Sequence, residues 1–263
     1  MPAAAADLPD PARTAQIVIL GEIHDNPAHH RFQAEAVAAL APRALVFEML
    51  DPGQAAALNA LDDRSQASMH AASGWDDSGW PDFAMYHPIF AAAPDARIHG
   101  AAVPKDEVRR AVREGAAALF GADAARFGLD RPLPPGEQAA RGALQARAHC
   151  DALPADLLPG MVEAQRLRDA AFARTALTAL DETGPPVVVI AGTGHARRDW
   201  GIPAAIALAR PDVTVMAIGQ GEGEEGKSGA YDAVILAPAP ARDDPCAGFA
   251  AERSAPGPEA DPR

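Results

Sequence analysis

Three apolar runs, each followed at once by a short polar motif, constrain the fold of this chain more than any other feature. Four-residue apolar runs are typical of the buried strands of a parallel sheet. In open α/β sheets, ligands bind in the crevice beyond the carboxyl ends of the strands. We therefore predict that His24, Glu48 and His195 gather in one polar site. The runs and their motifs are 17–20 with Gly21–His24, 44–47 with Glu48, and 187–190 with Gly192–His195.

Strand and helix patterns alternate along the chain, which predicts one α/β domain with a mostly parallel central sheet flanked by helices. The region after the third predicted strand has helical periodicity and no strand signal, so we predict a helical insertion there. The six predicted strands are 15–20, 44–47, 97–101, 187–190, 213–219 and 233–236. The parts of the predicted domain, residues 1–263, are a sheet core over about 15–103 and 184–238, a helical insertion over about 104–183, and a disordered tail over about 250–263.

Three shorter segments carry signals of their own. Residues 69–81 are rich in Ser, Gly, Asp and Trp, which is typical of a long functional loop. Residues 83–92 predict a helix in which Pro88 marks a break or a fresh start. The charged, glycine-rich segment 221–229 predicts a mobile turn.

The net charge of −13 disfavours a nucleic-acid-binding surface, because such a surface needs basic residues that displace counterions. It equally disfavours attachment to an acidic membrane through a basic patch. No stretch is long and apolar enough to span a bilayer, and residues 1–10 lack the charged and apolar regions of a signal peptide. Cys150 and Cys246 either pair in an oxidising compartment or remain two separate thiols.

The motifs after the first two strands pair carboxylates with an imidazole. Glu22 and His24 are two residues apart, so in an extended segment they point to the same side, one as base or ligand and the other as its partner. Glu48 directly follows a buried strand, where a carboxylate must be paired, hydrogen-bonded or at the edge of a site. A solvated turn and an ordinary surface acid remain the structural alternatives for these positions.

The glycine-rich turn before His195 is followed by Arg197 and Arg198, a combination that predicts an anion site or else a solvated charged turn. His29 and His30 lie close to His24 in the chain, which suggests a metal site, but adjacent side chains on a predicted helix diverge, so we expect a solvated or capping role.

Aromatic residues gather between the second and third predicted strands, although they are scarce elsewhere. Trp75, Trp80 and Tyr86 lie close together in the chain, with His87 next to the tyrosine. Such a cluster either stacks on a flat ligand or forms a small satellite core under the loop. Tyrosine is also one of the residue types that bind haem iron.

Taken in order, these segments resemble the ChaN-like haem-binding uptake proteins, within the wider superfamily that includes the Tiki and TraB proteins and the erythromycin esterases. The resemblance covers about residues 15–250. The chain departs from the family pattern after the third strand, where it reads Ala102–Lys105. The matching pieces are 20–27 with His30 and Gln33; 47–49; 79–81 with 86–89; 161–165 with Arg168 and Asp169; 192–195 with 201–203; Tyr231 and Asp232; and 244–246.

The resemblance implies haem binding in iron acquisition by a periplasmic or membrane-associated, often lipid-anchored protein, although the N-terminal residues leave a cytoplasmic location open. It implies Tyr86 as the ligand of the haem iron, with a nearby cation or hydrogen-bond donor lowering the pKa of its phenol. Trp80 and His87 would lie against the haem, and Arg197 or Arg198 would meet its propionates. Because haem is flat and large, a homodimer that sandwiches it between two chains is a further expectation.

The related esterases and peptidases imply an alternative function, a hydrolase that uses the same strand-end pocket. In that case Glu22 or His24 acts as the general base that activates water. Glu48 and His195 orient the water or, together with His24, hold a catalytic Zn or Mn ion with one open position. A third interpretation is a plain α/β scaffold whose polar strand ends hydrogen-bond to one another.

Overall fold

The computed structural model describes residues 8–223, 230–244, 246 and 247. Most of the predicted turn at 221–229 and the whole predicted tail at 250–263 therefore lie outside the described residues. Six strands form one sheet in which every neighbouring pair is parallel, so the predicted α/β class is confirmed. The strands are β1 (Ile17–Glu22), β2 (Ala44–Phe47), β3 (Arg97–Gly100), β4 (Val187–Gly192), β5 (Val215–Glu222) and β6 (Ala233–Ala237).

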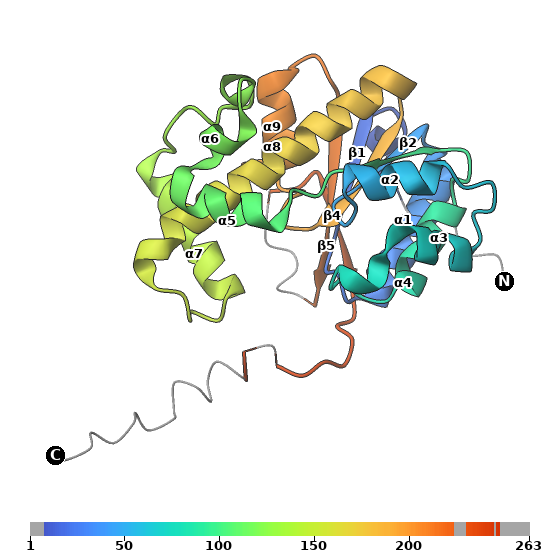
Figure 1. The fold of residues 1–263 in the computed structure, drawn as a ribbon, viewed down its shortest axis with the longest axis horizontal. Helices are drawn as coiled ribbons and strands as arrows, with labels where there is room; N and C mark the ends of the chain where they lie inside the picture. Colours follow the sequence, from blue (N-terminus) through green and yellow to red (C-terminus); the bar gives the residue numbers. More distant parts are fainter. Residues whose placement is uncertain (1–7, 224–229, 245, 248–263) are drawn as a thin grey trace.

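The strand order is β3-β2-β4-β1-β5-β6, which places β1 and β4 side by side in the middle of the sheet (Figure 1). The chain leaves β1 toward β2 but leaves β4 toward β5, on the other side of β1. Ligands of open α/β sheets bind where the strand order reverses in this way. In the register, β1 and β4 end opposite each other at Glu22 and Gly192, and β2 ends two residues earlier, at Phe47 opposite Ile190.

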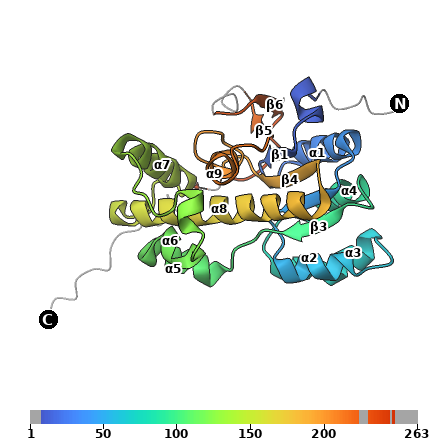
Figure 2. The ribbon, with the colours of Figure 1, turned by 90° about the horizontal axis from the view of Figure 1, so that it is seen from above.

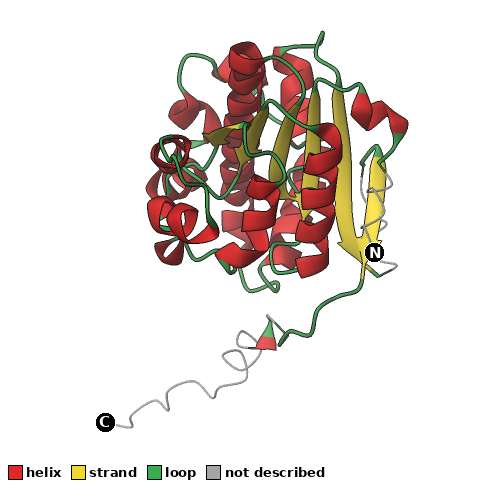
Figure 3. Ribbon diagram, turned by 90° about the vertical axis from the view of Figure 1, so that its right-hand side faces the viewer, coloured by secondary structure: helices red, strands yellow, loops and turns green. Residues whose placement is uncertain are grey.

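Helices cover both faces of the sheet (Figure 3). Alternate residues of β1 separate the two cores: Val18 and Leu20 belong to the core that contains residues of α1 and α4, whereas Ile17 and Ile19 belong to the core that contains residues of α8 and α9. The described helices are α1 (Pro27–Leu40), α2 (Pro52–Asn59), α3 (Gln66–Ser73), α4 (Phe83–Ala91), α5 (Lys105–Glu114), α6 (Ala116–Phe120), α7 (Pro135–Ala148), α8 (Leu158–Thr183) and α9 (Ile202–Ala209), with short 3₁₀ turns between some of them.

The segment predicted as a helical insertion, 104–183, contains α5 to α8 and no strand. Helix α8 has 26 residues and is about 39 Å long at the usual rise per residue. It contacts α5, α6 and α7 as well as strands β2, β3 and β4, so it joins the helical group to the sheet (Figure 2).

Two local predictions between β2 and β3 are corrected. The long loop expected over 69–81 is partly helical, since α3 extends to Ser73 and a 3₁₀ turn covers Trp75–Asp77. The break expected at Pro88 does not occur, because α4 runs through it without interruption. No helix among the described residues is long and apolar enough to cross a membrane.

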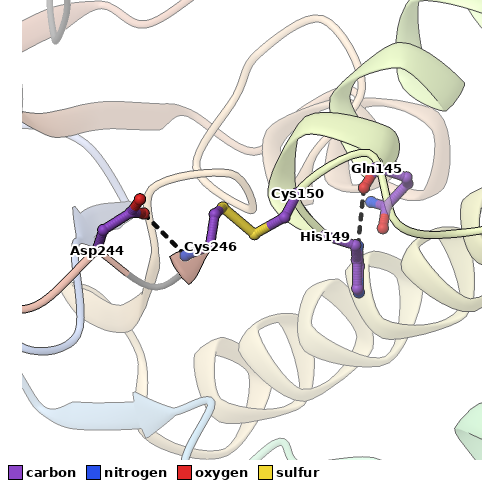
Figure 4. Close-up of a disulfide and its surroundings, with 5 residues drawn as sticks. All are labelled: Gln145, His149, Cys150, Asp244 and Cys246. Carbon is purple, nitrogen blue, oxygen red and sulfur yellow. Dashed lines mark hydrogen bonds between the residues drawn. A yellow bond between two sulfur atoms is a disulfide. The ribbon is translucent and has the colours of Figure 1, made fainter. Parts of the chain in front are cut away.

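A disulfide joins Cys150, just after α7, to Cys246 beyond the sheet (Figure 4), and so decides between the two alternatives for the cysteines. Their Cα atoms lie 5.4 Å apart. The segment between β6 and Cys246 has a second anchor, because Arg242 pairs with Asp25 at 2.8 Å and with Glu222 at 2.7 Å. The chain after the sheet is thus tied both to the loop after β1 and to the helical group.

We expect reduction of this disulfide to lower the free energy of unfolding by about 2–4 kcal/mol, because the bond closes a long loop in the unfolded chain. The two cysteines are 96 positions apart, and β4, β5 and β6 lie between them. Urea unfolding followed by far-ultraviolet circular dichroism, with and without dithiothreitol, measures the effect. The Cys150→Ser/Cys246→Ser double variant should match the reduced protein and ignore dithiothreitol; equal stability of all forms would contradict the prediction.

Candidate functional site

Glu22, at the end of β1, is the centre of the first polar cluster. It is 1 % exposed, and its Oε1 accepts a hydrogen bond from the Tyr86 hydroxyl at 2.9 Å. The same oxygen lies 2.7 Å from His24 Nδ1, so the two residues do lie on one side, as their spacing predicts. The Trp80 ring lies 4.7 Å from the His24 ring, measured between ring centroids. An aromatic side chain therefore borders the carboxylate–imidazole pair.

His29 and His30 hold the loop that carries His24. His29 Nδ1 accepts a hydrogen bond from the Ile23 backbone N–H at 2.9 Å. His30 Nε2 donates to the His24 carbonyl at 2.8 Å. Both side chains are buried, so the solvated role expected for them is wrong, and their function in the fold is to position the loop.

Glu48, directly after β2, is the centre of the second cluster and is 3 % exposed. Its Oε1 pairs with Arg168 of α8, and its Oε2 accepts from the Gly192 backbone N–H at 2.6 Å. His195 Nε2 lies 3.6 Å from Oε1. Burial alone would raise the pKa of Glu48, but the charges of His195, Arg168 and His24 outweigh it and hold this pKa below the ordinary range.

His195 in turn is held by α8. Its Nδ1 lies 2.5 Å from Asp169 Oδ1, and the Gln165 amide nitrogen lies 3.0 Å from the same ring nitrogen. The Phe172 ring meets the imidazole edge to face, with centroids 4.8 Å apart. Burial raises the pKa of Asp169 despite the opposing effect of His195.

The two clusters meet at Gly192, the last residue of β4. A Cβ atom at this position would lie 2.9 Å from His24 Nε2 and 3.5 Å from Glu48 Oε2. The glycine therefore leaves space that any other residue would fill. His24, Glu48 and His195 come together at the ends of β1, β2 and β4, as the strand-end motifs predict.

The contribution of α8 to this site was missed from the sequence. Gln165, Arg168 and Asp169 appear there only as pieces of the family resemblance, without a role. Their spacing of i, i+3 and i+4 puts all three on one helix face. That spacing is the sequence signal that the three side chains act together, although other charged residues of α8 lie on its other faces.

Tyr86 lies in the site, but not in the state expected of an iron ligand. Its side chain is fully buried, packed against His30 and Trp75. Burial, together with the neighbouring Glu22, raises the pKa of the phenol far above its ordinary value, so the predicted lowering is wrong. His87, next to it on α4, binds the Arg64 carbonyl at 3.3 Å.

The two arginines after His195 are already engaged with carboxylates. Arg197 binds Asp199 at 2.6 and 2.9 Å and lies 4.0 Å above the Trp200 ring. Arg198 binds Asp232 at 2.7 Å. An anion at either guanidinium would have to compete with these carboxylates, so their role toward a propionate stays a prediction.

The alternative Zn or Mn site gains no support. Across the part of the chain that the structure describes, no group of three or more His, Cys, Asp or Glu side chains is arranged to hold a metal ion. The physical reason lies in the ion pairs above: Arg168 and the Gly192 amide occupy the oxygens of Glu48, and Asp169 holds one nitrogen of His195.

His24 differs from the other strand-end residues because solvent reaches it: its side chain is 31 % exposed. Its Nδ1–H is committed to Glu22, which leaves the Nε2 lone pair as the available donor to a metal. No described residue hydrogen-bonds to this Nε2. Burial lowers the pKa of His24, but the hydrogen bond and charges of the carboxylates outweigh it and raise this pKa overall.

Comparison with known proteins places these features in context. The family model described as "Haem-binding uptake, Tiki superfamily, ChaN" matches residues 8–206. The ChaN structure of Campylobacter jejuni, described for cofacial haem binding, matches with a TM-score of 0.63 and 20 % identity, over 84 % of this chain and 87 % of that one. The type III effector HopBA1 matches with a TM-score of 0.48 and 15 % identity, over 86 % and 89 %. No curated protein matches the chain.

Proposed function

The chain belongs to the haem-binding uptake (ChaN) family of the Tiki superfamily, and from this premise we propose that it binds haem and serves in haem or iron uptake. The observation that carries the proposal is the family match itself. It spans residues 8–206 and includes all three strand-end motifs and the α8 residues that complete the site. The likeness of fold to ChaN of Campylobacter jejuni, which binds haem cofacially, supports the same ligand class.

Among the residues of the site, His24 is best placed to bind the haem iron. Binding of haem iron needs a lone pair that solvent can reach, and His24 Nε2 meets this condition beside a gap that Gly192 leaves open. Glu22 fixes the ring from the other nitrogen, as carboxylates do for metal-binding histidines. Tyr86 does not fit as it lies, because its hydroxyl is buried and donates to Glu22. We therefore assign the iron to His24 and a supporting role to Tyr86.

The neighbouring surface suits a flat, largely apolar ligand with acidic ends. Trp80 is partly buried beside His24 and presents an aromatic ring. A cavity of about 210 Å³ opens between α1 and α4, lined in part by Met85 and Pro88. Arg31 lines the same cavity, and its guanidinium makes no ion pair with any described residue. Arg31 is therefore the better propionate partner than Arg197 or Arg198.

Titration of the purified protein with haemin tests the function directly. We expect a shifted Soret band that saturates at about one haemin per chain, because each chain has one His24 site. Iron-free protoporphyrin is the control, since it retains the flat apolar body but offers no metal. An unchanged Soret band, or equal affinity for both porphyrins, would contradict iron-centred binding at this site.

We further propose that two copies of the chain meet across their haem sites, with one haem at each His24, since a large flat ligand bound by one chain exposes a second face. Light scattering during the haemin titration should then show the mass doubling as the site fills.

For location we propose the periplasm or a membrane surface, supported by the disulfide, which persists in oxidising compartments. Thiol labelling of Cys150 and Cys246 in cell fractions tests this, because reduced cysteines would point to the cytoplasm.

A further inference from the structure

We propose that a cavity between α7, α8 and α9 is a second binding site, for a small molecule with an apolar body and a hydrogen-bond donor at one end. The cavity has a volume of about 480 Å³, within the range of small-molecule sites. It lies among the helices of the insertion and α9, on the side of Asp169 away from the strand-end clusters that contain His24 and Glu48, and it adjoins them through the Asp169–His195 pair. Neither the family match nor the haem proposal assigns it a ligand.

Most of the cavity wall is apolar. Phe127, Leu129 and Leu133 come from the segment before α7, and Leu208 comes from α9. Leu208 is 58 % exposed, so it lies at the open side of the cavity. These residues would bury the apolar body of a ligand, which accounts for that part of the proposal.

The polar end of the ligand is specified by Asp169, which also lines the cavity. Asp169 is 2 % exposed, and its Oδ1 is taken by His195. Its Oδ2 is buried and accepts no hydrogen bond from any described residue. Buried carboxylate oxygens almost always have a partner, so this oxygen lacks a donor that a bound molecule would supply.

The arginines that line the cavity do not favour an acidic ligand. Arg141 donates to Glu137 at 2.5 and 2.9 Å. Arg166 donates to Glu163 at 2.6 Å and to two backbone carbonyls, and Arg198 donates to Asp232. Each guanidinium already has its carboxylate, so the group in the cavity wall that still lacks a partner is Asp169 Oδ2, which needs a hydrogen-bond donor. An ammonium or hydroxyl group supplies that donor, whereas a carboxylate would meet Asp169 as a like charge.

Three probes that share one skeleton separate these chemistries: 2-phenylethylamine, 2-phenylethanol and 3-phenylpropanoic acid. Binding to the full, disulfide-bonded chain is measured by calorimetry and by the change in tryptophan fluorescence, to which Trp200 in the cavity wall contributes. We expect the amine or the alcohol to bind and the acid to bind at least about tenfold more weakly. Binding of the acid alone, or of none of the three, would overturn the proposal, and Asp169 Oδ2 would then be served by water alone.

Two variants of cavity residues and one surface control test whether the amine binds in this cavity. Asp169→Asn should weaken the amine at least about tenfold, whereas Asp156→Asn, the same change at an exposed position, should match the wild type. Because Asp169→Asn also disturbs His195, a second variant is needed. Ala207 is exposed and lines the cavity mouth, so Ala207→Phe should block binding without disturbing the core. Unchanged affinity in Ala207→Phe, or displacement of the amine by one equivalent of haemin, would refute a separate site.

Discussion

Replacement of His24 by alanine is expected to abolish the shifted Soret band and to weaken haemin binding more than about 100-fold. Loss of a residue that merely orients a metal ligand typically costs about 10–100-fold in affinity, and loss of the ligand itself should cost more. His24 is the strand-end imidazole that solvent reaches, and it reaches the surface beside Trp80. The measurement is a haemin titration by absorbance, with the Soret position compared between variant and wild type.

Two further variants separate the role of the iron ligand from the role of the residues that hold it in place. Glu22→Gln keeps the shape of the side chain but weakens its hold on His24 Nδ1, so we expect affinity to fall about 10–100-fold with a Soret band that is still shifted. Tyr86→Phe removes only the hydrogen bond to Glu22 Oε1, so it should cost much less. Because Glu22 and Tyr86 are buried, circular dichroism must first show that each variant is folded.

The opposite ranking would overturn the assignment. If Tyr86→Phe removes the Soret shift and His24→Ala leaves it, the iron is bound by a phenolate that has left Glu22. Such a change would require α4 or the Trp80 segment to move, since Tyr86 is packed against His30 and Trp75 in the present structure. Resonance Raman spectroscopy distinguishes the two ligands, because an iron–phenolate bond has vibrations that an iron–imidazole bond lacks.

The strand-end residues could be predicted from the sequence because two simple geometries apply to them. Residues two apart in an extended segment share a side, which placed Glu22 with His24. Parallel strands present their carboxyl ends at one edge of the sheet, which brought Glu48 and His195 to the same place. The first geometry depends on local periodicity alone and the second on the strand–helix alternation that predicts a parallel sheet, and both agree with the register of β1, β2 and β4.

The residues that depend on tertiary packing could not be predicted in the same way. A tyrosine in an aromatic segment has the same local pattern whether it is exposed or, like Tyr86, buried against Glu22. The face that α8 turns toward the sheet depends on how the whole helix packs, so Arg168 and Asp169 gained their roles only from the fold. Two cysteines likewise do not disclose their own pairing.

Replacement of Arg168 by methionine is expected to destabilise the fold by about 3 kcal/mol, because it leaves the carboxylate of Glu48 buried without its cation. Glu48 lies between two central strands and is nearly inaccessible to water, whereas the side chain of Arg168 is 29 % exposed. Its partial exposure places the expected loss at the lower end of the range for broken buried pairs. Urea unfolding followed by circular dichroism measures the difference.

The pH dependence of this loss follows from the pKa of Glu48. Burial would raise this pKa, but the charges of His195 and Arg168 outweigh burial and lower it. A carboxyl whose folded pKa is depressed stabilises the fold above its unfolded pKa and loses that contribution as the pH falls through its folded pKa. The difference between wild type and Arg168→Met should therefore be complete at pH 7 and should shrink once the pH falls below the ordinary Glu value of 4.5.

A double-mutant cycle shows whether the loss belongs to the ion pair. Glu48→Gln removes the charge that Arg168→Met leaves unpaired, so the double variant should be more stable than the sum of the two single losses predicts. Arg110→Met is the matched control, because Arg110 pairs with Glu114 on the exposed surface of α5 and should matter far less. Strictly additive losses, or an equal loss in Arg110→Met, would show that Arg168 stabilises the protein through packing and not through the charge of Glu48.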